Sequence, residues 1–112
     1  MNYNGKVTAN HEGEWIIDRT PCVYILTSNN NAALYIGVTS QLPQRIWQHK
    51  NGVVEGFTKK YNVHKLVYFE LFEDMATAIT REKQLKQWKR KWKLDLVRET
   101  NPNFLELSAE YQ

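Results

Sequence analysis

The sequence predicts an α/β domain of the α+β type, in which helices flank a small, mainly antiparallel three-stranded sheet. Its 112 residues are 42% hydrophobic and 12% aromatic, which suffices for one folded domain without disulfide support. Two apolar, β-branched runs separated by a short polar loop are typical of a β-hairpin. A third such run lies among segments of helical periodicity, so we expect the order β-β-α-β-α-α.

The first half of the predicted domain is a hairpin followed by a helix. Strands are expected over Cys22–Thr27 and Leu34–Val38, with the serine and asparagines of residues 28–31 in the turn. Ser40 is placed to cap a helix of about residues 41–50. Pro43 falls in the first turn of that helix, where a missing N–H group costs nothing.

The second half is predicted to contain one strand and two helices. After a loop over residues 51–62, the run Leu66–Phe72 has the composition of a buried strand. Asp74 is a typical N-terminal cap for a helix of about Met75–Trp88, and a last helix is expected over about Lys91–Arg98.

The sequence also bounds the domain and its setting. We expect residues 1–20 to form a partly ordered extension, residues 21–108 the folded domain and residues 109–112 a tail. Cys22 is the single cysteine, so no internal disulfide forms, which favours a reducing, cytoplasmic setting. No apolar run approaches membrane-spanning length, and the N-terminus lacks the pattern of a secretion signal.

Positive charge is concentrated near the C-terminus. The formal net charge is +3, and seven basic residues lie between Arg81 and Lys93 against one acid, Glu82. Such a stretch is suited to face phosphate groups, although a solvated helical face explains it equally well. The candidates for contact with nucleic acid are Lys59, Lys60, Lys86, Lys89, Arg90 and Lys93.

Glu82 does not fit a purely structural helix. It lies four residues after Ala78 and three before Leu85, on the expected apolar stripe that also includes Met75 and Ile79. A carboxylate there costs several kcal/mol unless it is paired or binds a cation. A structural salt bridge or a rotated stripe would explain it, and so would a Mg²⁺ site that needs only one or two carboxylates.

Four other residues have both a structural and a functional explanation. Arg45 and His49 are four apart and share a helical face, which suits either an exposed surface or a phosphate clamp beside an acid–base group. Tyr24 and Tyr35 lie within the two apolar runs, where ordinary packing also accounts for them.

Taken together, these residues resemble the GIY-YIG nuclease family. Cys22-Val23-Tyr24 is similar to the first half-motif, with Cys and Val in place of Gly and Ile, and Tyr35-Ile36-Gly37 matches the second in full. The resemblance spans about Cys22 to Leu107 and includes three further segments. These are Leu42–His49, similar to the arginine helix, Arg81–Lys86, similar to the glutamate segment, and Asn101–Phe104, similar to the closing Asn-Pro segment. The nearest branch is the short, single-domain bacterial one, similar to the N-terminal nuclease module of the bacterial excision-repair endonuclease.

The resemblance implies a catalytic set of Tyr24, Tyr35, Arg45, His49, Glu82 and Asn101. Glu82 would hold one divalent metal ion, Mg²⁺ or Mn²⁺, and Arg45 would bind the scissile phosphate. Tyr35 is favoured as the general base, with Tyr24 orienting it, and the reverse assignment stays open. His49 would relay a proton or bind a phosphate oxygen.

Asn101 would hold Glu82 in place or position the active-site residues without itself contacting the substrate. The resemblance reaches this residue only through the closing segment of the domain, so the two roles stay open.

The implied function is a metal-dependent endonuclease that hydrolyses phosphodiester bonds in DNA, in repair or recombination. Branched, damaged or single-stranded DNA are the candidate substrates, and a monomer is favoured. One alternative is a catalytically weak or inactive nucleic-acid-binding domain of the same fold. A structural or protein-interaction domain is the other.

Overall fold

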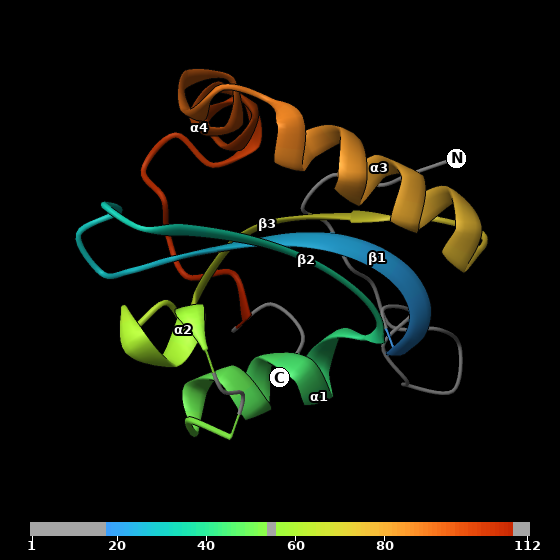
Figure 1. Ribbon diagram of the computed structural model, residues 1–112, viewed down its shortest axis with the longest axis horizontal. Coiled ribbons are helices and arrows are strands. Elements are labelled where there is room, and N and C mark those ends of the chain that lie inside the picture. The colour runs from blue at the N-terminus through green and yellow to red at the C-terminus, as the bar shows by residue number, and fades with distance from the viewer. Residues whose placement is uncertain (1–17, 54–55, 109–112) are drawn as a thin grey trace.

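The computed structural model describes residues 18–53 and 56–108, which form a three-stranded sheet covered by helices on both faces (Figure 1). The strands are β1 (Asp18–Thr27), β2 (Leu34–Gln41) and β3 (Lys65–Leu71), and the helices are α1 (Leu42–Lys50), α2 (Phe57–Lys60), α3 (Met75–Gln87) and α4 (Arg90–Thr100). Both strand pairs are antiparallel, in the order β2-β1-β3. The predicted fold class and element order are confirmed, and α2 is one short addition within the predicted loop.

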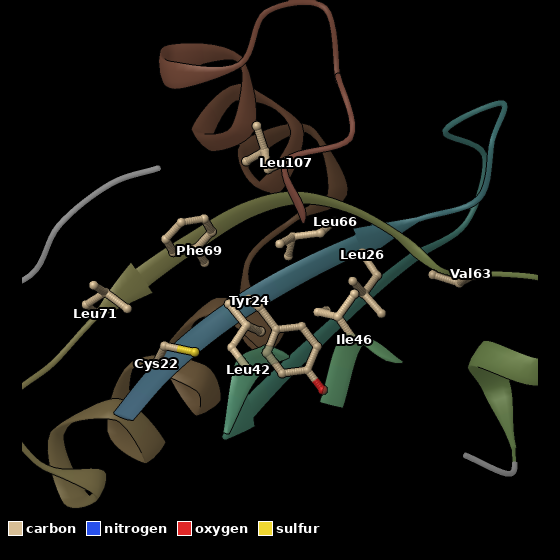
Figure 2. Close-up of a cluster of buried hydrophobic side chains, with 10 residues drawn as sticks. All are labelled: Cys22, Tyr24, Leu26, Leu42, Ile46, Val63, Leu66, Phe69, Leu71 and Leu107. Atoms are coloured by element: carbon tan, nitrogen blue, oxygen red, sulfur yellow. The ribbon is translucent and has the colours of Figure 1, made fainter. Parts of the chain in front are cut away.

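The central strand β1 is buried on both faces. Tyr24 and Leu26 lie in the hydrophobic cluster on the α1 side, whereas Val23 and Ile25 lie in the cluster under α3 and α4. Covering on both faces explains why the run is apolar throughout rather than alternating. Figure 2 shows the ring of Tyr24 among the side chains of the first cluster, with its hydroxyl at the margin of that cluster.

Tyr24 requires a glycine beside it. Gly37 pairs with Tyr24 across β1 and β2, so both residues face the same side of the sheet. A methyl group at Gly37 would lie 2.8 Å from Cε1 of Tyr24 and closer still to Cζ and the hydroxyl oxygen. The ring of Tyr24 therefore occupies the space that any other side chain at Gly37 would need.

A buried ion pair fastens α3 to the sheet. Nε and Nη2 of Arg81 donate to the two carboxylate oxygens of buried Glu70 on β3, each over 2.9 Å. The hydroxyl of Tyr68 also donates to this carboxylate. Arg81 belongs to the basic stretch with potential to face phosphates, but its guanidinium is engaged by Glu70.

Several predicted boundaries are corrected. Ser40 does not cap α1, because pairing with β1 carries β2 on to Gln41, which is the N-cap and makes no side-chain capping bond. β1 likewise begins at Asp18, inside the stretch predicted as an extension.

The predicted N-terminal cap of α3 is confirmed. The side chain of Asp74 accepts a hydrogen bond of 2.7 Å from the backbone N–H of Thr77 and caps α3. Burial raises the pKa of the Cys22 thiol to about 12, so it stays protonated at neutral pH. Within residues 18–53 and 56–108, no helix has the length and apolar character needed to cross a membrane.

The contact between Tyr24 and Gly37 predicts a strong coupling. Gly37→Ala should lower the free energy of unfolding by about 1–3 kcal/mol, because the added methyl overpacks the ring. In a Tyr24→Leu background, which removes the colliding ring atoms, the same change should cost less than about 0.5 kcal/mol. Urea unfolding of the four proteins in this cycle measures the coupling. Strictly additive costs would mean that the ring is not what excludes a side chain at Gly37.

Candidate active site

Three aromatic rings from three different elements meet on the α1 side of the sheet. The ring centroids of Tyr24 on β1 and Tyr35 on β2 are 6.2 Å apart. His49, in the last turn of α1, lies 5.9 Å from Tyr24 and 5.6 Å from Tyr35. The structure thus brings together three of the residues that the sequence predicted as catalytic.

Both ring nitrogens of His49 have buried partners. Nε2 lies 3.2 Å from the hydroxyl oxygen of Tyr24, and Nδ1 lies 3.2 Å from the hydroxyl oxygen of Thr58. Burial, together with the nearby charge of Arg45, lowers the pKa of His49 to about 4. At neutral pH the imidazole is therefore uncharged, with one donor and one acceptor nitrogen.

Tyr24 is held in its protonated form. Burial raises the pKa of its phenol well above the usual value, and neighbouring Tyr35 acts in the same direction. Arg45 opposes this shift by charge and by hydrogen bonding. A protonated Tyr24 next to an uncharged His49 forms a neutral hydrogen-bonded pair.

Arg45 lies beside this pair, one helical turn before His49. Its side chain is half-buried and lines a hollow formed by the end of β2, by α1 and by Met75 of α3. Its influence on the pKa of both Tyr24 and His49 shows that the guanidinium is electrostatically close to them.

Glu82 lies in the helical layer on the other side of the sheet. It lies on α3 between buried Ala78 and buried Leu85, and its side chain is 15% exposed. Its carboxylate is 3.2 Å from Nζ of Lys86, one turn further along the same helix. Ile79, expected on the same stripe, is exposed, so the buried stripe is narrower than the sequence suggested.

The edge strand β2 is where the two layers meet. Tyr35 lines a hollow together with Leu34, Ile36 and Phe57, and this hollow is closed by Lys86 and Lys93 from the α3–α4 side. Lys86, the partner of Glu82, thus shares a surface hollow with Tyr35. In Figure 1, α1 and α2 lie on one side of the sheet and α3 and α4 on the other, and groups from the two layers share surface at the β2 edge.

The described hydrogen bonds of Asn101 do not involve Glu82. Its side-chain amide donates to the carbonyl oxygens of Val67 and Leu105, and its oxygen accepts from the backbone N–H of Leu105. Asn101 therefore ties the end of α4 to β3, on the opposite edge of the sheet from β2.

Five of the six predicted basic residues fall into two groups. Lys86, Arg90 and Lys93 line hollows beside β2, whereas Lys59 and Lys60 are exposed on α2. Lys89 lies over the ring of Trp92, with Nζ 5.5 Å from the centroid.

Thr58 is a site residue that the sequence did not reveal. It is buried on α2 and its hydroxyl meets Nδ1 of His49. A four-residue helix has too little periodicity to mark which residue faces inward.

Comparison with known proteins decides the family. The GIY-YIG catalytic domain matches residues 20–95 of the chain. The chain belongs to the GIY-YIG nuclease family.

This GIY-YIG chain also has small prokaryotic relatives. It is 41% identical over 75 residues to a UPF0213 protein of Clostridium perfringens, covering 67% of this chain and 80% of the relative. A UPF0213 protein of Staphylococcus saprophyticus is 34% identical over 77 residues, covering 69% and 93%. One from Haloquadratum walsbyi is 31% identical over 77 residues, covering 69% and 85%. No solved structure matches the chain significantly.

GIY-YIG nucleases generally use divalent metal ions, and the residues present fit one kind of site. Residues 18–53 and 56–108 contain no group of three or more His, Cys, Asp or Glu side chains able to hold a metal. The side chain of Glu82 is mostly covered, and its one described ion pair is with Lys86 of the same helix. Such a carboxylate fits an Mg²⁺ or Mn²⁺ ion that keeps most of its water ligands.

The lowered pKa of His49 predicts a loss of stability in mild acid. Between pH 7 and pH 5 the unfolded chain protonates His49, whose ordinary pKa is 6.5, whereas the folded protein resists until about pH 4. This part of the stability is fully present above pH 6.5. At pH 5 its loss should amount to about 1–2 kcal/mol.

Chemical unfolding at pH 7, 6 and 5 tests this for the wild type and for His49→Gln, which cannot titrate. The free energy of unfolding should fall more steeply with acidification in the wild type. Parallel curves for the two proteins would contradict the assignment.

Proposed function

We propose that this GIY-YIG domain is a metal-dependent endonuclease that hydrolyses phosphodiester bonds in DNA. The observation that carries the proposal is the meeting of Tyr24, Tyr35 and His49, with Arg45 beside them, at the β2 edge. Packing alone does not require an arginine to lie close to two buried hydrogen-bonding rings.

Arg45 is suited to bind the scissile phosphate. Its guanidinium stays protonated and presents a planar fork that matches phosphate oxygens. It lines an open hollow rather than being closed into the core, so a phosphate can approach it. The guanidinium would then offset the negative charge that builds up in the transition state.

Tyr35 is the better candidate for the general base. Tyr24 is buried and keeps its proton, and its hydroxyl is already engaged with His49. Tyr35 is less buried and lines the hollow that also contains Lys86 and Lys93, so its ring lies at the surface beside two cations. Tyr24 would orient Tyr35, and His49 would accept or relay the proton that Tyr35 takes from the attacking water.

Glu82 would hold the metal ion. When bound there, a divalent ion supplies Lewis acidity that stabilises the leaving 3′ oxygen. Glu82 must exchange its partner Lys86 for the ion, which is feasible because Lys86 is exposed and sits one helical turn away. Asn101 contributes by holding the end of α4 against β3, and it is not among the reacting groups we propose.

Plasmid nicking tests the proposal directly. Wild-type protein should convert supercoiled plasmid to the nicked form with Mg²⁺ or Mn²⁺ and not with EDTA. Arg45→Ala and Glu82→Gln should each lower the rate by about 100-fold or more, because each removes charge stabilisation of the transition state. Glu99→Gln, an exposed carboxylate of α4, serves as the matched control and should retain the rate. Equal background from the wild type and both site variants would refute the enzyme and leave the inactive DNA-binding domain and the structural domain as the remaining explanations.

Salt dependence separates both nucleic-acid functions from a structural domain. Affinity for labelled DNA should fall steeply between about 50 and 200 mM salt, because bound phosphates release counterions. Arg90→Gln and Lys93→Gln should each weaken binding and reduce the salt slope by about 1. Arg98→Gln is the control, because Arg98 lies over the ring of Phe104 and pairs with Asp95, away from the β2 hollows. Undetectable binding at low salt would favour a domain that contacts only protein.

A further inference from the structure

Two large aromatic side chains stand exposed next to the site. Phe57 begins α2 and Tyr61 follows its last residue, and their ring centroids are 4.7 Å apart with the planes tilted by 45°. Phe57 is 45% exposed and Tyr61 is 48% exposed. Neither belongs to the two hydrophobic clusters of the core, so core packing does not account for them.

The two rings lie on the same surface as the hollow lined by Tyr35. A hollow of about 430 Å³ is lined by Phe57 and Tyr61 together with Leu34, Arg90 and Lys93 and the two alanines before Leu34. Leu34, Phe57 and Lys93 also line the hollow that contains Tyr35. The aromatic pair and the proposed base are therefore connected by a continuous surface.

The charged side chains that line this surface are all positive. Lys86, Arg90 and Lys93 line the two hollows, and no carboxylate is among their described lining residues. Nζ of Lys60 lies 5.4 Å from the ring centroid of Tyr61. Exposed aromatic rings set among cations are the combination that binds single-stranded nucleic acid, since phosphates meet the cations while bases stack on the rings.

We propose that Phe57 and Tyr61 form a stacking subsite for an unpaired base of a DNA strand whose backbone passes Tyr35. The proposal rests on the proposed nuclease function and specifies its substrate. In a duplex, both faces of each base are covered by its neighbours, so the rings have nothing to stack on. Every base has a π-face, so the subsite favours unpaired over paired strands without selecting a sequence.

Binding in EDTA isolates the subsite from cleavage. Fluorescence anisotropy would compare a mixed-sequence strand of about 15 nucleotides, within the usual span of single-strand sites, with the same strand annealed to its complement. Phe57→Ala and Tyr61→Ala should each weaken single-strand binding by about 5- to 100-fold and change duplex binding by less than about twofold. Trp47→Ala is the matched control, because Trp47 is an exposed aromatic residue of α1 that is 60% accessible, and it should change neither affinity.

Two further measurements keep stacking distinct from packing. Phe57→Tyr should retain single-strand affinity and Phe57→Leu should lose it, because only the former keeps an aromatic face. A 2-aminopurine base in the strand should be quenched on binding the wild type and much less on binding Phe57→Leu. Thermal unfolding should be unchanged in the variants that lose affinity, since both positions are exposed.

The outcomes separate this proposal from the nuclease function. If Phe57→Ala, Tyr61→Ala and Phe57→Leu bind the single strand like the wild type, the stacking subsite is wrong, and this holds even if nicking depends on Glu82. If single-strand and duplex binding weaken equally, the rings serve general affinity and the subsite is likewise wrong. A loss of affinity for the single strand but not for the duplex supports the subsite. This conclusion holds even if Glu82→Gln nicks plasmid as well as the wild type does.

Discussion

The packing of the Tyr24 ring over Gly37 is the constraint on which the site depends. Without a side chain at Gly37, the ring lies along the sheet face and its hydroxyl reaches the margin of the core, where it meets His49. The same hydrogen bond ties β1 to the last turn of α1, and His49 in turn ties that turn to Thr58 of α2. The space left at Gly37 thus permits the hydrogen bonds that link these two helices to the sheet.

On the opposite face of the sheet, the ion pair of Glu70 and Arg81 holds α3 in position. Removing Arg81 would leave the carboxylate of buried Glu70 uncompensated, which costs about 3–5 kcal/mol, so the rotation of α3 is strongly constrained. Glu82 is the next residue and points about 100° further around the helix axis. The ion pair that holds α3 on β3 therefore also determines where the carboxylate of Glu82 stands. The ion pair on the β3 side thus also constrains the residue proposed as the metal ligand.

Local sequence signals predicted the fold well, and long-range contacts limited the prediction of the site. The apolar runs predicted the three strands, and Asp74 marked the start of α3, because these signals act within a few residues. Ser40 failed as a cap because strand pairing with β1 outweighed its local preference. The Glu70–Arg81 pair joins residues 11 apart, and only the docking of α3 on β3 brings them together.

The same difference between local sequence signals and long-range contacts applies to the residues around the site. The family resemblance indicated Tyr24, Tyr35, Arg45 and His49, which the structure brings close together. Thr58 and the pair of Phe57 and Tyr61 carried no periodic signal, because α2 is a single turn. The contacts that mark them form only in the folded chain. Thr58 meets His49 of α1 on the same side of the sheet, and Phe57 and Tyr61 share a hollow with Arg90 and Lys93 of α4.

Lys86 connects metal binding with DNA binding if the proposed function holds. In the protein alone it neutralises Glu82, over 3.2 Å, and it also lines the hollow beside Tyr35. A divalent ion at Glu82 removes the need for that pairing and leaves the ammonium group available to a phosphate. Conversely, a phosphate that attracts Lys86 leaves Glu82 with an uncompensated charge, which raises its affinity for a cation. Each ligand therefore strengthens the binding of the other, as reciprocal linkage requires, and the catalytic set is complete only when both are present.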